Sequence, residues 1–172
     1  MSEPVKTDGY GFAKADLPPL TVLLAEDEEF SMKLEKSVLG QLGIKDIITA
    51  YDGEDARIIL EQEVLNIDLV ISDIYMPKMD GIELLRVVRQ KRPDLPFLLL
   101  TSETSSDAVR VAQELGVDGY IIKPFSPAKV DKTISAILAR RRPELADVWL
   151  RSADRRQFDD VGHPQLKKLY KY

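Results

Sequence analysis

The chain has 172 residues, of which 44% are hydrophobic and 31% charged, enough for one domain with a packed core and a few tens of further residues. The absence of cysteine excludes disulfides, thiolate zinc sites, iron–sulfur clusters and cysteine nucleophiles, and the single histidine excludes a multi-histidine metal site. A net charge of -5 argues against nucleic-acid or membrane binding. The polar start and the lack of an apolar run near the ~20 residues that span a bilayer predict a cytoplasmic protein.

Apolar patterns after residue 19 predict strands that alternate with helices. The strands are expected at residues 20–25, 44–50, 68–72, 96–101 and 119–122. The helices are expected around residues 30–42, 56–64, 82–89, 108–115 and 127–142. Strands separated by helices of this length form a parallel sheet with right-handed crossovers. The sequence therefore predicts an α/β domain over 20–142, between a flexible leader at 1–19 and a C-terminal extension at 143–172.

The extension is predicted to begin with a short amphipathic helix. Leu145, Val148 and Trp149 follow Pro143 at a spacing that places them on one face of a helix. A helix of this length is not stable alone, and an exposed Trp beside Leu and Val would leave a sizeable apolar surface in water. We therefore expect it to pack, either on its own domain near the fifth helix or against a second copy in a homodimer.

Polar residues occupy the carboxyl ends of four predicted strands. They are Glu26, Asp27, Asp73, Thr101 and Lys123. Ligands of such sheets bind beyond these strand ends, so the side chains are expected to converge. Carboxylates brought together repel one another and need a cation, and ligands that are all oxygen favour Mg²⁺. A carboxylate, Mg²⁺, a hydroxyl and an ammonium together suit phosphoryl transfer, although each residue alone would be an ordinary strand-end or surface residue.

Four segments resemble the receiver domain of two-component response regulators: VLLAEDEEF, DLVISDIYMPKMDGIELL, FLLLTSE and GYIIKPFSP. The resemblance covers about residues 20–141, and the most specific segment is the second, in which an Asp ends an apolar strand and Met-Asp-Gly opens a helix. It implies a flavodoxin-like, doubly wound (βα)5 fold with strand order 2-1-3-4-5. It also implies a cis peptide bond between Lys123 and Pro124.

The resemblance assigns the chemistry to individual residues. Asp73 would accept the phosphoryl group. The Mg²⁺ site would consist of Glu26, Asp27, Asp73 and the main-chain carbonyl of Tyr75, with Glu26 in place of the commoner Asp and acting through water. Lys123 would neutralise the phosphoryl oxygens.

The resemblance also implies a switch and two kinds of partner. Thr101 would move onto the phosphoryl group, and Tyr120 would swing inward behind it. Their movement would reshape the face formed by the fourth helix, the fifth strand and the fifth helix, where a downstream protein would bind. The phosphoryl group would come from a sensor histidine kinase or a histidine phosphotransfer protein, and the domain would catalyse only its own phosphorylation and dephosphorylation.

Two alternatives remain at this stage. Residues 143–172 are too few for a winged-helix or helix-turn-helix effector domain, so the chain could be a stand-alone receiver acting by protein contacts, or the receiver portion of a longer regulator whose effector domain is missing. A haloacid-dehalogenase-type phosphatase also uses Asp, Thr and Lys at strand ends. That class requires a second Asp two residues after the nucleophile, where this sequence has Tyr75.

Overall fold

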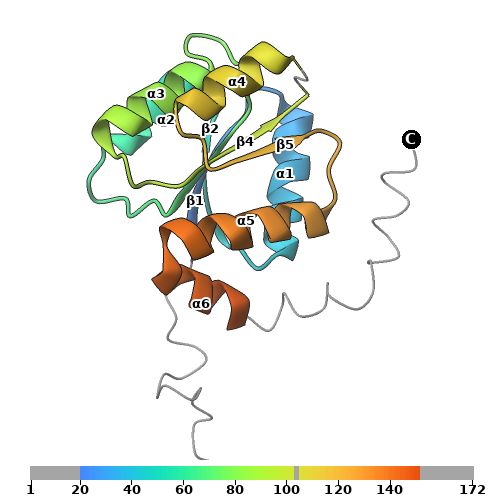
Figure 1. The fold of residues 1–172 in the computed structure, drawn as a ribbon. Helices are drawn as coiled ribbons and strands as arrows, with labels where there is room; N and C mark the ends of the chain where they lie inside the picture. The colour runs from blue at the N-terminus through green and yellow to red at the C-terminus, as the bar shows by residue number, and fades with distance from the viewer. Residues whose placement is uncertain (1–19, 103–104, 152–172) are drawn as a thin grey trace, which may run out of the picture.

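The computed structural model describes residues 20–102 and 105–151, and within them a parallel sheet alternates with helices (Figure 1). The strands are β1 (Thr21–Ala25), β2 (Asp46–Ala50), β3 (Leu69–Ser72), β4 (Phe97–Thr101) and β5 (Gly119–Ile122). The helices are α1 (Glu29–Gln41), α2 (Gly53–Leu60), α3 (Gly81–Lys91), α4 (Ser106–Glu114), α5 (Pro127–Arg141) and α6 (Pro143–Arg151). The predicted leader and the part of the extension after residue 151 lie outside the described residues. In the described part, no helix combines the length and the apolar character that crossing a membrane requires.

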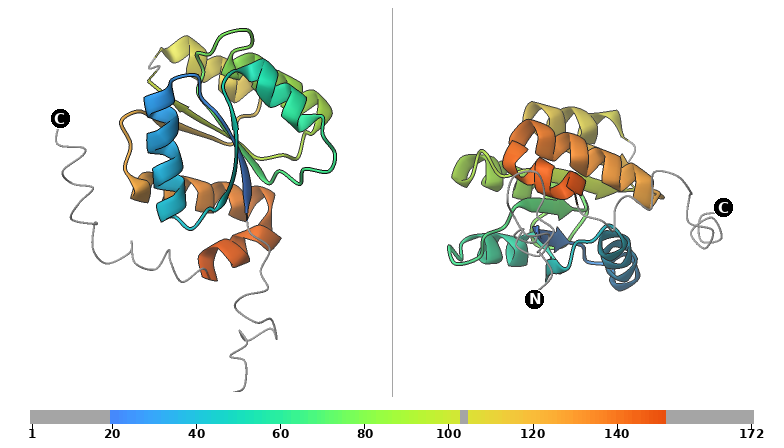
Figure 2. Two further views of the ribbon diagram at one scale, coloured as in Figure 1. Left: turned by 180° about the vertical axis from the view of Figure 1, so that it is seen from behind. Right: turned by 90° about the horizontal axis from the view of Figure 1, so that it is seen from below.

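The strand order is β2-β1-β3-β4-β5 with every pair parallel, which confirms the predicted flavodoxin-like fold. Helices α1 and α5 cover one face of the sheet and α2, α3 and α4 the other (Figures 1 and 2). Alternate residues of β1 serve the two faces: Val22 and Leu24 pack towards α1 and α5, whereas Leu23 and Ala25 pack towards the other layer. This burial on both faces explains the nearly continuous apolar strand sequences.

The buried face of α1 differs from the predicted one. Phe30 is the first of the apolar residues whose helical spacing predicted this helix, but it is 73% exposed. Glu28 caps the helix by accepting hydrogen bonds from the main-chain N–H groups of Phe30 and Ser31, so Phe30 lies in the first turn, beyond the sheet. The inward-facing residues are Met32, Glu35, Val38 and Leu39.

Helix α2 is also displaced from its predicted position. It begins at Gly53, after the capping residue Asp52, and ends at Leu60. Main-chain hydrogen bonds of turns follow Leu60, and Val64 is 87% exposed in this connection. Val64 continues the helical spacing of the apolar residues by coincidence, because it has no core surface to contact.

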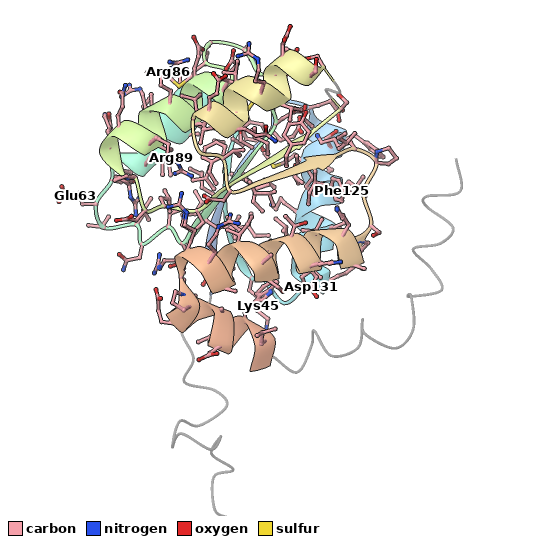
Figure 3. The ribbon with its side chains drawn as sticks, in the orientation of Figure 1. Lys45, Glu63, Arg86, Arg89, Phe125 and Asp131 are labelled. Carbon is pink, nitrogen blue, oxygen red and sulfur yellow. The ribbon has the colours of Figure 1, made fainter. Side chains whose placement is uncertain are left out.

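A buried carboxylate fixes the edge of the sheet where the strands begin. Asp118, directly before β5, accepts hydrogen bonds from Arg89 of α3 at 2.7 Å, from the main chain of Phe97 at 2.9 Å and from Arg141 of α5 at 2.6 Å. Arg89 projects from α3 towards the sheet, as Figure 3 shows. These contacts tie both helical layers to the sheet at the amino ends of β4 and β5.

Helix α6 packs against α5 of the same chain (Figures 1 and 2). Arg142, just before α6, lies 3.6 Å from Asp68, which precedes β3, so α6 starts at the amino edge of the sheet. Trp149 is only 5% exposed, and its indole N–H donates a hydrogen bond of 2.9 Å to Ser135 Oγ on α5. The predicted helix therefore forms, and it packs on its own domain.

Replacing Trp149 with Ala should lower the free energy of unfolding by about 3 kcal/mol, because it empties a space in the core shared by α5 and α6. Urea denaturation followed by circular dichroism measures this difference. Leu150→Ala is the matched control, because Leu150 is 57% exposed on the same helix and its loss should change the free energy by less than about 0.5 kcal/mol. Equal effects of the two changes would contradict the docked position of α6.

Candidate functional site at the carboxyl edge of the sheet

Main-chain hydrogen bonds between neighbouring strands set the positions of the predicted site residues. The N–H of Asp73 donates to the carbonyl of Ala25 at 3.0 Å, which places Asp73 beside Glu26 at the ends of β3 and β1. The N–H of Lys123 donates to the carbonyl of Thr101 at 2.9 Å, which aligns the ends of β5 and β4. The sequence prediction that these residues share one edge of the sheet is confirmed.

The ammonium group of Lys123 lies among three carboxylates. Its nitrogen is 2.6 Å from Glu26 Oε2 and 2.8 Å from Glu35 Oε1. A longer contact of 3.3 Å reaches Asp73 Oδ2. The side chains of Glu26 and Glu35 are 1% and 2% exposed, so these charges interact with little screening by water. A single ammonium cannot balance three carboxylates, and the site carries excess negative charge when all are ionised.

Burial and charge change the proton affinities of these groups. Burial raises the pKa of the Glu26 carboxyl, and the hydrogen bond from Lys123 offsets this only in part. Burial raises the pKa of Glu35 to about 8, again against the influence of Lys123. Burial alone would lower the pKa of the Lys123 ammonium, but the charge of Glu35 and the hydrogen bond to Glu26 raise it above its ordinary value. Lys123 therefore stays protonated at neutral pH.

The predicted metal ligands differ in orientation. Glu26 is turned inward: Oε1 accepts a 2.9 Å hydrogen bond from the main chain of Glu28, and Oε2 contacts Lys123. Asp27 is exposed at the surface, and Tyr75 is 59% exposed in the loop after β3. Within residues 20–102 and 105–151, no three His, Cys, Asp or Glu side chains are grouped so that they could hold a metal ion as they stand.

The loop after Asp73 explains the Met-Asp-Gly motif. Asp73 Oδ1 accepts a 2.6 Å hydrogen bond from the N–H of Ile74. The N–H of Gly81 donates to the carbonyl of Ile74 at 2.7 Å, and a Cβ at position 81 would lie 2.0 Å from the carbonyl oxygen of Asp73. Only Gly allows this approach. Asp80 and Glu83 form a capping box at the start of α3, so the motif fixes the loop that carries Asp73.

The same loop is anchored to α2. Lys78 has a positive φ of 64°, and its ammonium pairs with Asp52 Oδ2 at 2.7 Å. The N–H of Gly53 donates to the carbonyl of Met79 at 3.0 Å. These contacts tie the connection between β3 and α3 to the start of α2.

The two predicted switch residues lie on β4 and β5. Thr101 ends β4 and is fully buried, at 0% exposure. Tyr120 is partly buried against the core layer of α2, α3 and α4. Lys123 and Pro124 are joined by a cis peptide bond, as the resemblance implied, and the next residue, Phe125, is buried beside α1 (Figure 3).

Glu35 is a site residue that our sequence reasoning missed. It lies in the middle of α1, three residues after Met32 and three before Val38, both of which face the core. A Glu inside an apolar stripe is a signal that the sequence does contain, because carboxylates are almost never fully buried without a partner. The spacing that predicted this helix was read from apolar residues alone, so Glu35 was passed over.

The family model described as "Response regulator receiver domain" matches residues 22–135. The curated relatives include the alkaline phosphatase synthesis transcriptional regulatory protein PhoP of Bacillus subtilis, which is 39% identical over 125 residues, or 73% of this chain and 50% of PhoP. The chemotaxis protein CheY of Pseudomonas aeruginosa is 33% identical over 123 residues, or 70% of this chain and 98% of CheY. The chain thus spans about half the length of PhoP and most of CheY.

Solved structures show the same fold. The response regulator receiver domain protein of Clostridium thermocellum has a TM-score of 0.67 at 25% identity, and the match covers 73% of this chain and 98% of that one. The CheX-CheY-BeF3-Mg+2 complex of Borrelia burgdorferi has a TM-score of 0.66 at 31% identity, with coverage of 70% and 90%. The family match, the relatives and the strand order agree, and the chain belongs to the response regulator receiver domain family of two-component systems.

Proposed function

We propose that this domain accepts a phosphoryl group on Asp73 and passes the signal on through protein contacts. The observation that carries the proposal is the position of Asp73 at the end of β3, 3.3 Å from the ammonium of Lys123. The donor is a phosphohistidine of a sensor histidine kinase or a phosphotransfer protein. A carboxylate oxygen of Asp73 attacks phosphorus while the bond to the imidazole nitrogen breaks, and Lys123 is close enough to neutralise charge on the phosphoryl oxygens.

Mg²⁺ is the cation that suits this edge of the sheet. The carboxylates around Lys123 exceed its single positive charge, and the available donors are all oxygen, which hard cations prefer. Asp27, Asp73 and the carbonyl of Tyr75 would hold the ion, with Glu26 acting through water because its own oxygens face Glu28 and Lys123. The bound ion would neutralise the phosphoryl group during transfer.

The output is a change in protein contacts. Thr101 moves onto the phosphoryl group and Tyr120 follows it, which shifts a two-state equilibrium and reshapes the face formed by α4, β5 and α5. The solved complex of CheY with CheX supports a protein as the downstream target. Helix α6 lies at the other end of the domain from α4 (Figure 1). The domain acts in the cytoplasm as a signalling module. It acts alone, as a homodimer through α5 or the extension, or as part of a longer regulator like PhoP.

Asp73→Asn should abolish phosphorylation, because an amide oxygen is a poor nucleophile for phosphorus. The test is incubation with Mg²⁺ and acetyl phosphate, followed by intact mass measurement for one added phosphoryl group. Asp94→Asn, at an exposed position between α3 and β4, should be labelled like the wild-type protein. Gel filtration of the same samples shows whether phosphorylation changes assembly. Wild-type labelling of the Asp73 variant would refute the assignment.

Asp27→Ala should weaken Mg²⁺ binding about tenfold or more and slow phosphorylation, since it removes a carboxylate that would face the ion. The same change should stabilise the metal-free protein by reducing repulsion at the site. Isothermal titration with Mg²⁺ and urea denaturation in a chelator measure the two effects. Glu29→Ala removes an exposed carboxylate nearby on α1 and should change neither. Unchanged Mg²⁺ affinity in the Asp27 variant would count against this ligand set.

A further inference from the structure

We infer that Glu35 is a positioning residue that holds the Lys123 ammonium on the α1 side of the site and thereby weakens its contact with a phosphoryl group on Asp73. The inference rests on the proposed function of Asp73 and Lys123. It adds a determinant of phosphoryl affinity that lies outside the five strand-end residues.

The distances show where the ammonium is held. Lys123 has three N–H donors and no acceptor, so its position depends on the oxygens around it. The two near oxygens belong to Glu26 and Glu35, at 2.6 and 2.8 Å, and the far one belongs to Asp73, at 3.3 Å. The ammonium therefore lies closer to the two glutamates than to the residue that receives the phosphoryl group.

Glu35 cannot readily release Lys123. Its side chain is 2% exposed, and it projects from the core-facing side of α1, which keeps the carboxylate away from water. Its Oε1 is 2.8 Å from the ammonium nitrogen but outside hydrogen-bond alignment, and no other donor among the described residues hydrogen-bonds to this atom. The attraction is therefore mainly one of charge. Burial raises the pKa of Glu35 to about 8, so the attraction acts in full where Glu35 is ionised, and a buried carboxylate that loses its counter-charge there is strongly unfavourable.

A phosphoryl group on Asp73 would then compete with Glu35 for the same ammonium. Any movement of Lys123 towards the phosphoryl oxygens separates it from Glu35. When Glu35 is ionised, its negative charge also repels the incoming phosphoryl charge, because both lie in a region with little water. Both effects act in one direction, so Glu35 lowers the affinity of the site for a phosphoryl group.

The test uses beryllofluoride with saturating Mg²⁺, since beryllofluoride binds a carboxylate without a covalent transfer step. Its dissociation constant is measured by ¹⁹F NMR titration of the full chain at about pH 9, where the Glu35 carboxyl, whose pKa burial raises to about 8, is ionised. Glu35→Leu, which removes the charge and fills the space, should bind about tenfold more tightly than wild type, and Glu35→Gln, which keeps the shape, should lie between the two. Glu29→Gln, an exposed carboxylate of α1, should bind like wild type.

A second measurement reports on Lys123 directly. The ¹⁵N signal of its ammonium should shift further on beryllofluoride addition in the Glu35 variants than in the wild-type protein, which a purely structural role of Glu35 would not cause. Circular dichroism confirms folding, and Glu35→Gln preserves the test if the Leu variant does not fold. Wild-type or weaker affinity in the folded variants would overturn the inference while leaving the proposed function intact. No binding by wild-type protein would overturn both.

Discussion

The attraction between one ammonium and three carboxylates holds the carboxyl edge of this domain together. Lys123 follows β5, and its partners follow β1, lie within α1 and follow β3. Removing one partner of a buried ion pair typically costs about 3–5 kcal/mol, so these contacts help to hold the loop between β5 and α5 in place. The same ammonium is the group that we propose neutralises the phosphoryl oxygens. On that proposal, stability and signalling would depend on one side chain.

The two edges of the sheet are built differently. At the amino edge, Asp118 binds Arg89, Arg141 and the main chain of Phe97, and every contact has a defined donor and acceptor. At the carboxyl edge, the negative charges outnumber the positive one, and one oxygen of Glu35 has no aligned donor. A buried hydrogen-bond network that is fully satisfied rigidifies a structure, whereas an unsatisfied buried oxygen is costly. The unsatisfied oxygen lies at the edge where we propose that phosphorylation occurs.

The sequence alone was sufficient for the fold and for most of the site, for identifiable physical reasons. Strands buried on both faces have apolar runs, Ser126 and Pro127 mark the start of α5, and parallel topology brings Asp73, Thr101 and Lys123 to one edge. Glu35 was missed because a periodicity argument treats every charged residue as outward-facing. Phe30 was misplaced because the cap at Glu28 sets where the helix begins, and apolar spacing does not report that. The sequence did not decide between packing of α6 on its own domain and packing on a second copy, because an apolar stripe does not identify the surface that it contacts.

The docking of α6 limits which parts of the domain can move. Helix α5 packs against the sheet on one side and against α6 on another, and Trp149 bonds to Ser135 in the second contact. A rigid-body shift of α5 would have to carry α6 with it or break that contact. Helix α4 contacts α3 and packs Ala112 into the core layer of α2, α3 and α4. If Asp73 is phosphorylated as we propose, the joined α5 and α6 would serve as the support against which α4 and β5 move.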